Sequence, residues 1–415
     1  MRLIRGKYSK VLAKLGPGLI SAVAGLEITN IGVFTYVGSR YGLAILWAII
    51  LSMMVTAFIQ QLAAEIGAES RRGLIVEVRE RFGLKLLLPF ILFLYISNMV
   101  TVSLNIAGAS MALEALTDIK WPLWALWIVS ISMIISSLKS YRGVERVLTA
   151  LAATLVVYVI LAIYYIIQEP HLILNVIYGA IIPDSTFSKD FMIDLLSIFG
   201  AAAAAYSLIF QAAGVVYEKI GIKELPEEFM DIMVGVVFTT LASISITIVS
   251  ALHLASQGIV VLTVHEAVMA LDAIGQYNTL LFTIGSVSAA LLAIEAINLC
   301  NAYVLYEYKT GHADLNAVVK SDIYPKLSIF TVLVSFLIAL VYSCVTGFKD
   351  ELFSEMNRWF SVIISLTSWL PTVIIVALYW RVKVLSSSFL RIIGGILAVA
   401  LVMVNVIGVI WIVKP

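Results

Sequence analysis

Apolar stretches of about 20 residues recur along the whole chain of 415 residues. Each stretch is long enough for an α-helix to cross a hydrocarbon layer about 30 Å thick. Only helices and closed barrels can satisfy their own backbone hydrogen bonds in lipid. Barrel strands would show alternating segments of about 10 residues, which the sequence lacks. We therefore predict an all-α integral membrane protein.

Eleven segments qualify as transmembrane helices. They cover 14–38, 43–67, 86–116, 121–138, 147–167, 190–216, 230–254, 278–306, 325–347, 358–380 and 389–413. The connections are short; we expect the longest, around 168–189, and the charged stretch "RRGLIVEVRERFG" to be loops. No segment is large or polar enough for a soluble domain. We therefore predict a single transmembrane domain over 1–415.

The distribution of positive charge predicts an orientation. Of the 27 Lys and Arg residues, 21 fall on the side of the N-terminus and six on the other side. Because cytoplasmic loops carry the excess of Lys and Arg, we predict a multi-pass protein of the cell membrane. Its N-terminus would be cytoplasmic and its C-terminus extracytoplasmic. A net charge of +1 without a basic block gives no basis for nucleic-acid binding.

Catalytic signatures are missing from the sequence. No His-Glu-x-x-His or Gly-x-Ser-x-Gly motif occurs, and the four histidines lie in predicted loops or at helix ends. Both cysteines, Cys300 and Cys344, lie in apolar segments, which argues against a disulfide framework or a thiolate metal site. We predict that the protein is not an enzyme and needs no cofactor.

The eleven segments divide into five, five and one. Repeat one would cover about 14–167, repeat two about 190–380, and the extra helix 389–413. In transporters built from inverted repeats, the first helix of each repeat is interrupted near the midplane. Here those helices carry "GLEITN" and "FGAAAAAYSLIFQAAG", both with polar residues inside an apolar segment. Neither has proline at the expected break, so an intact alanine helix is the alternative.

The strongest functional signal is the acid Glu27 inside the first segment. A charge at the centre of a membrane helix costs roughly 2.5–3.5 kcal/mol on insertion scales, so such acids are functional sites by default. Asn30 follows one turn later, and the carbonyl of Ala201 with Tyr206 could complete a shell from the sixth segment. Every candidate ligand is oxygen, which favours Mg²⁺, Ca²⁺ or Mn²⁺ over softer metals. The alternative is a buried acid that only holds helices together.

A second acid lies inside the eighth segment. Glu295, Asn298 and Asn301 in "LLAIEAINLCNAY" recur every three residues and share one helix face. They could line an ion pathway, or they could bind the third segment through Asn98 and Asn105. The sequence leaves both interpretations open.

The N-terminal third resembles Nramp-type divalent-metal transporters. The run "GPGLISAVAGLEITN" stands where that family carries Asp-Pro-Gly-Asn. The most specific match is a Gln-x-Leu-Ala-Ala run in the second helix and a Glu-x-x-Arg-Glu-Arg stretch in its loop, here at 60–67 and 77–82. The resemblance implies eleven or twelve helices in a LeuT-type arrangement of two inverted repeats of five.

The resemblance also implies site residues. The metal-binding Asp and Asn fall on Glu27 and Asn30, and the carbonyl-donating Ala falls on Ala201. The family's Met and His of the sixth helix fall on Ala204 and Tyr206, its second His falls on Gln211, and the two acids of its third helix fall on Val102 and Asn105. Losing the Met sulfur resembles the Nramp-related magnesium transporters, while losing the acids and imidazoles implies weak or absent proton coupling.

The function that we expect is secondary transport of divalent cations by alternating access, with Mg²⁺ favoured and Mn²⁺ possible as the substrate. Glu27, Asn30 and Ala201 would bind the cation, Ala204 and Tyr206 would shape the site, and Asn105, Gln211, Glu295 and Asn298 would support it or line the pathway. The partners would be the cation and the lipid bilayer, with the oligomeric state left open. The rivals are an amino-acid permease of the same fold and a non-transporting Nramp-like sensor; such sensors carry a long soluble tail, whereas this chain ends directly after its last segment.

Overall fold

The computed structural model describes residues 27–137, 156–183, 188–202, 204–349, 352–381 and 388–413. Within these ranges every regular element is a helix. The N-terminal tail, the first half of the first predicted segment and the start of the fifth lie outside the described residues. Residues 138–155 and 414–415, which bear on the predicted orientation, also lie outside them.

Helices occupy all eleven predicted segments. They are α3 (Ile28–Tyr41), α4 (Leu46–Ser70), α6 (Leu84–Thr117), α7 (Trp121–Ser136), α9 (Val156–Gln168), the pair α11 (Lys189–Ala202) and α12 (Ala205–Glu218), α13 (Leu225–His253), α15 (Asn278–Thr310), α17 (Ile323–Thr346), α18 (Leu352–Arg381) and α19 (Ser388–Val413). By length and composition, the described residues contain 8 stretches able to cross a membrane. The first of these joins α3 to α4 through η1 (Gly42–Ile45), and α7 and α9 are shorter apolar helices. The predicted helical membrane architecture is confirmed.

Two segments that we expected to be loops are helical. Helix α10 (Leu172–Ile181) lies within the predicted loop 168–189, and α5 (Leu74–Phe82) lies within the charged stretch between α4 and α6. Both are too short to span a membrane, so a search for apolar stretches of spanning length passes over them. In α5, the apolar residues Leu74, Ile75 and Val78 are buried. Of its charged residues, Glu77 is buried with them, while Arg79, Glu80 and Arg81 are exposed. The prediction of loops was wrong because short helices of this kind form by packing against the bundle, which hydropathy does not report.

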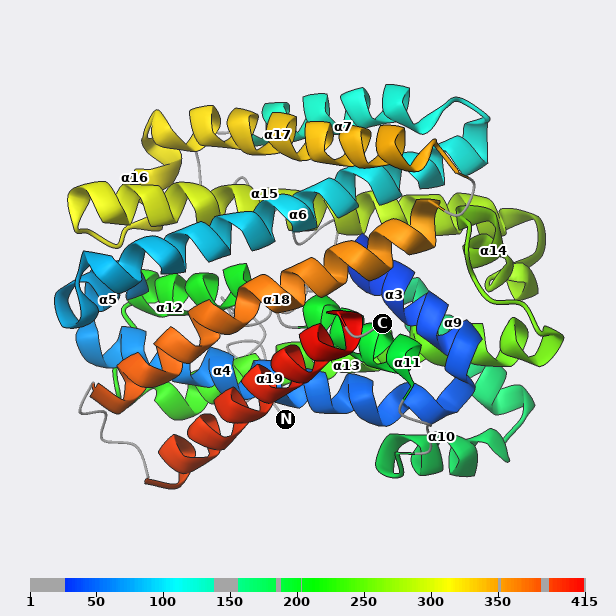
Figure 1. The fold of residues 1–415 in the computed structure, drawn as a ribbon, viewed down its shortest axis with the longest axis horizontal. Coiled ribbons are helices and arrows are strands. Elements are labelled where there is room, and N and C mark those ends of the chain that lie inside the picture. Colours follow the sequence, from blue (N-terminus) through cyan, green and yellow to red (C-terminus); the bar gives the residue numbers. More distant parts are fainter. Residues whose placement is uncertain are drawn as a thin grey trace, which may run out of the picture.

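The short elements complete the described chain. They are η3 (Ala255–Gln257), α14 (Val264–Met269), η4 (Asp272–Tyr277) and α16 (Leu315–Lys320). Figure 1 shows α7 and α17 side by side along one edge of the bundle, next to α15 and α6. Helix α3 packs against α13, α18, α11 and α6, so the segment that carries Glu27 lies inside the bundle.

Close helix contacts depend on glycine at particular positions. A Cβ atom on Gly200 of α11 would lie 1.8 Å from the carbonyl oxygen of Ser361 on α18. A Cβ atom on Gly108 of α6 would lie 2.6 Å from Cγ1 of Ile28. Small residues allow backbones to approach in this way, which replaces the hydrophobic driving force that lipid cannot supply.

The sixth segment is interrupted. Helix α11 ends at Ala202 and α12 begins at Ala205, with Ala204 between them in an extended conformation at φ −64° and ψ 121°. The alternative of an intact alanine helix is therefore wrong. Helix propensity is a weak influence that tertiary contacts override, and here the hydroxyl of Thr56 on α4 donates a hydrogen bond to the Ala202 carbonyl at 3.1 Å. That bond satisfies a carbonyl released by the break.

Charged side chains join three of these helices at one end. Asp194 of α11 has a fully buried side chain, and its two carboxylate oxygens lie 3.2 Å from Arg40 of α3 and 2.5 Å from Arg358 of α18. The hydroxyl of Tyr41 also donates a hydrogen bond to Asp194 at 2.7 Å. Asp190 pairs with the same two arginines at 3.1 and 3.4 Å. The network holds α3, α11 and α18 together, and a buried carboxylate of this kind depends on both cations.

Candidate cation site at the interrupted helices

Glu27 lies immediately before the first residue of α3. Its side chain is buried with 1% exposure, and its backbone is extended at φ −101° and ψ 174°. Its carbonyl oxygen accepts hydrogen bonds from the amides of Asn30 at 2.9 Å and Ile31 at 3.2 Å. The described part of the first segment therefore begins its helix after Glu27, which puts the carboxylate at a helix start.

Asn105 of α6 holds this carboxylate in place. Its Nδ2 donates to Oε2 of Glu27 at 2.6 Å, and its Oδ1 accepts from the amide of Ile28 at 3.3 Å. Nδ2 of Asn105 also donates a hydrogen bond to the backbone carbonyl of Thr101 at 2.9 Å. Asn105 thus bridges α6 to both the side chain and the backbone at the start of α3. The resemblance had singled out this position only as one where an acid is lost.

Within the described ranges, no positively charged side chain is paired with Glu27. Among the described residues, no lysine or arginine forms an ion pair with it. A buried carboxylate without a countercharge is costly, and one neutral amide offsets only part of that cost. A bound cation would supply the missing charge.

Two further polar residues follow Glu27 on the first turn of α3. Asn30, a predicted ligand, is fully buried with 0% exposure. Thr29 is equally buried, and its hydroxyl has no hydrogen-bond partner among the described residues. Sequence reasoning passed over Thr29, although a threonine between an acid and an amide in an apolar segment was a visible signal. Its hydroxyl is a buried oxygen two residues after Glu27 that lacks a hydrogen-bond donor among the described residues.

The second interrupted helix supplies backbone groups. Ala201 belongs to the last turn of α11, where carbonyls have no partner further along the helix. The Ala204 carbonyl is already engaged, because the amide and hydroxyl of Ser207 donate to it at 3.1 and 2.8 Å. Ala201 therefore stays the candidate carbonyl ligand, while Ala204 contributes only a methyl group.

Tyr206 links the break between α11 and α12 to Glu27. It lies in the first turn of α12 with 1% exposure, and its hydroxyl is within electrostatic range of the Glu27 carboxylate. Its backbone carbonyl accepts a hydrogen bond from the thiol of Cys300 on α15 at 3.8 Å. Helix α3, which begins directly after Glu27, also packs against α11, the helix that ends at this break.

Glu295 lies in a different part of the bundle. Its carboxylate accepts hydrogen bonds from Ser132 at 2.5 Å and Ser136 at 2.8 Å, both on α7, and from Tyr324 on α17 at 3.4 Å. Asn298 donates to Ser132 at 3.2 Å. Glu295 and Asn298 therefore join α15 to α7 and α17, and no described contact links them to Glu27.

The other predicted amide contacts divide between two places. Asn98 of α6 donates to Oδ1 of Asn301 at 2.7 Å, which is one of the contacts expected between the third and eighth segments. Asn105, the second residue of that expected contact, binds Glu27. Gln211 lies further along α12, and its amide donates to Glu228 of α13.

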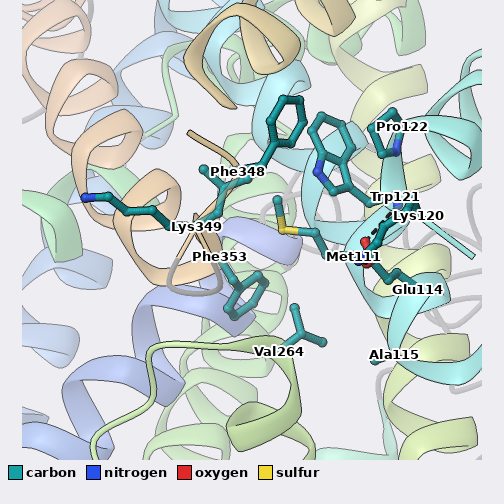
Figure 2. A pocket seen from close by; sticks show the side chains of 11 residues that line it. Met111, Glu114, Ala115, Lys120, Trp121, Pro122, Val264, Phe348, Lys349 and Phe353 are labelled. Carbon is teal, nitrogen blue, oxygen red and sulfur yellow. Dashed lines mark hydrogen bonds and ion pairs between the residues drawn. The ribbon is translucent and has the colours of Figure 1, made fainter. Parts of the chain in front are cut away.

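A cavity of about 430 Å³ lies apart from these residues (Figure 2). It is lined by the ends of α6 and α7, by α14 and by the start of α18. Its acid, Glu114, already accepts from the ammonium of Lys120 at 3.0 Å and from the amide of Trp121 at 2.7 Å. Because both oxygens are engaged, this cavity offers no carboxylate to a metal ion.

The candidate site at Glu27 has few ligand atoms, and all of them are oxygens. Within the described ranges, no three His, Cys, Asp or Glu side chains gather closely enough to hold a metal ion. The candidate site therefore combines one carboxylate with amide, hydroxyl and backbone oxygens. Such a set suits a cation that keeps part of its water shell.

Comparison with known proteins gives partial matches in sequence. "Divalent metal cation transporter MntH" of Deinococcus radiodurans is 31% identical over 114 residues, which cover 26% of this chain and 25% of that protein. "Metal transporter NRAT1" of Oryza sativa subsp. japonica is 30% identical over 79 residues, or 19% of this chain and 14% of that protein. The alignment thus spans about a quarter or less of the length of these relatives.

Comparison of structures extends over nearly the whole chain. A manganese transporter of Eremococcus coleocola, crystallised with an aromatic bis-isothiourea compound, matches with a TM-score of 0.77 at 15% identity, covering 96% of this chain and 86% of that one. MhsT in complex with L-phenylalanine matches with a TM-score of 0.61 at 14% identity, covering 94% and 98%. These matches confirm the LeuT-type fold. The family described as "Nramp: Natural resistance-associated macrophage protein-like" matches residues 18–411, and this chain therefore belongs to the Nramp family.

Proposed function

We propose that this protein is a secondary transporter of divalent cations that works by alternating access, with Mg²⁺ as the favoured substrate and Mn²⁺ as the second. The observation that carries the proposal is the buried Glu27 carboxylate. Its hydrogen-bond partner among the described residues is a neutral amide, and it lies at the start of α3, a helix packed against α11 and α6. The names of the relatives, which are metal transporters, support the same substrate class.

The choice of a cation over an amino acid rests on the backbone amides. A permease of this fold would bind a substrate carboxylate at free N–H groups of the interrupted helices. At the start of α3, the amides of Ile28, Asn30 and Ile31 already donate to Asn105 or Glu27. At the start of α12, the amide of Ser207 donates to Ala204. These contacts, together with the negative charge of Glu27, leave little to attract an anion.

The preference for Mg²⁺ follows from the donors. Ala204 stands where the resemblance places a thioether, so every remaining candidate ligand is oxygen. Mg²⁺ dehydrates reluctantly and binds proteins through one or two carboxylates while keeping several waters. An alanine methyl leaves room for such water. Mn²⁺ prefers similar oxygen ligands, which makes it the second substrate of the proposal.

Proton coupling in this proposal is weak or absent. The two positions on α6 that the resemblance associates with a proton path carry Val102, which is buried and apolar, and Asn105, whose amide does not titrate. Tyr206 and Gln211 stand at the two positions of imidazoles on α12. These residues offer no group that exchanges protons readily near neutral pH.

The proposal includes a topology. The N-terminus would be cytoplasmic and the C-terminus extracytoplasmic, because 21 of the 27 Lys and Arg residues fall on the N-terminal side. Two inverted repeats, about 14–167 and 190–380, would make up one transport domain together with a final helix. The break between α11 and α12 supports this division, since it occurs in the first helix of the second repeat.

Flux measurements in proteoliposomes test the proposal. The wild-type protein should take up Mg²⁺ and Mn²⁺, and Glu27→Gln should reduce the uptake to about a tenth or less, because the site loses its only charged ligand. Glutamine keeps an oxygen that accepts from Asn105, so the variant should fold. Glu227→Gln, which neutralises an exposed acid, serves as the control. Equal flux in wild type and Glu27→Gln would refute the site. Amino-acid uptake without cation uptake would favour the permease, and the absence of any flux would favour a sensor.

A further inference from the structure

An unsatisfied amide oxygen lies in the middle of α12, away from Glu27. The side chain of Gln211 has 0% exposure, and its Nε2 donates to Oε1 of Glu228 on α13 at 2.5 Å. The other atom of the amide head, Oε1, is buried and has no hydrogen-bond partner among the described residues. Buried acceptors are rarely left in this state, so the atom requires an explanation.

Negative charges surround this amide. Glu228 has 4% exposure and Asp231 has 9%. They are three positions apart on α13, so they lie on one helix face. Asp231 and Glu218 are close enough to Glu228 for their charges to repel its carboxylate. Glu228 itself forms no ion pair within the part of the chain that the structure describes.

We propose that Gln211, Glu228 and Asp231 form a second, weaker binding site for a divalent cation. The inference rests on the proposed function and makes this site a station on the cation's route. Two carboxylates and one amide oxygen are a suitable set for a cation that keeps several waters. The side-chain amide of glutamine carries an oxygen and an NH₂ group. A cation bound to Glu228 would displace the hydrogen bond from Gln211, and rotation of the amide by half a turn would then direct its oxygen to the cation.

The position of the site fits a route along α12. Tyr206, in the first turn of this helix, lies near Glu27, and Gln211 follows five residues later, which is about 8 Å along the axis. The helix ends at Glu218, and the chain returns through the start of α13, where Glu228 and Asp231 lie. The station therefore lies between the main site and the membrane face that we propose to be cytoplasmic.

Cation titration of the purified full-length protein tests the station. Mn²⁺ binding, followed by calorimetry and by EPR of the free ion, should show two sites in the wild type, one tighter than the other. Glu228→Gln and Asp231→Asn should each remove the weaker site and leave the tighter one. Glu227→Gln, an exposed acid one residue away on the same helix turn, is the matched control and should retain both sites. Mg²⁺ should compete for both.

A gain-of-function variant covers the case in which those changes prevent folding. Gln211→Glu adds a third carboxylate and should tighten the weaker site by about tenfold, because the charge of the ligands sets the affinity of such sites. The second site would be refuted if Glu228→Gln kept two Mn²⁺ sites with wild-type affinities. It would also be refuted if Gln211→Glu left the Mn²⁺ affinity of the weaker site unchanged. If Glu27→Gln abolishes all binding and flux while the station variants change nothing, the proposed function stands without the station. If no divalent ion binds the wild type, both fail.

Discussion

Replacing Asn105 by leucine should destabilise the protein in a way that a divalent cation reverses. The side-chain amide of Asn105 makes two hydrogen bonds at the start of α3. One joins it to the Glu27 carboxylate at 2.6 Å, and the other to the backbone amide of Ile28 at 3.3 Å. Leucine has a similar size but makes neither contact, so a buried carboxylate oxygen and a buried amide lose their partner. Each unsatisfied group costs about 1–3 kcal/mol, and a charged one costs more. We expect a loss of about 3–5 kcal/mol.

Thermal unfolding in detergent, with and without Mg²⁺ or Mn²⁺, measures this effect. A cation at Glu27 supplies the charge that Asn105 only partly offsets, so the Asn105→Leu protein should recover much of its Tm when the cation is added. A ligand at 100 times its Kd stabilises the state that it binds by about 2.7 kcal/mol. The gain on adding the cation should therefore be comparable with the loss caused by the substitution.

Asn98→Leu is the matched control. Asn98 lies on the same helix, is equally buried, and donates to Asn301 at 2.7 Å without touching Glu27. This variant should also lose stability, because it breaks a buried amide pair. The rise in its Tm on adding the cation should be no larger than the rise in the wild type. An Asn105→Leu protein with the Tm of the wild type, or equal rescue of both variants, would refute the role assigned to Asn105 at the site.

Three further predictions concern the frame and the selectivity of the site. Asp194→Asn should cost about 3 kcal/mol in unfolding free energy, measured as a lower Tm, because two arginines lose the charge of a carboxylate that they share. Gly200→Ala should abolish folding or lower the Tm sharply, since its Cβ would lie 1.8 Å from the carbonyl of Ser361, whereas Gly395→Ala, with its nearest neighbour at 3.5 Å, should be tolerated by the same measure. Ala204→Met should favour Mn²⁺ over Mg²⁺ in competition uptake, because a thioether prefers the softer ion; an unchanged ratio would contradict the placing of Ala204 at the site.

Much of the frame was predictable because lipid simplifies the problem. Any segment of about 20 apolar residues must be helical in a membrane, so the helices follow from hydropathy alone. Helices α5 and α10 do not follow in this way, because they are short and do not span. Their existence depends on packing, such as the contact of α10 with η1 through Gly179, whose Cβ would lie 2.1 Å from the carbonyl of Leu43. Hydropathy carries no information about such contacts.

The residues of the candidate site also differ in how far the sequence alone could identify them. Glu27 was identifiable because an acid is rare inside a membrane segment. The free-energy cost of a charge in lipid indicates a functional residue without any knowledge of the fold. Asn105 and Thr29 were harder to identify, since polar amides and hydroxyls are common in membrane helices and join neighbours for many reasons. Only the packing of α6 against α3 decides that Asn105 meets Glu27 while Asn98 meets Asn301.

The buried acids and amides that the sequence singles out thus serve two purposes. Glu295 and Asn298 take their partners from serine and tyrosine hydroxyls, so the carboxylate of Glu295 is enclosed by donors from α7 and α17. Among the described residues, the Glu27 carboxylate receives one donor, from the side-chain amide of Asn105. A carboxylate surrounded by donors has no need of a cation, whereas one with a single neutral donor keeps lone pairs for a ligand. The number of donors, rather than the presence of an acid, separates the proposed transport site from the contact that holds the outer helices to the bundle.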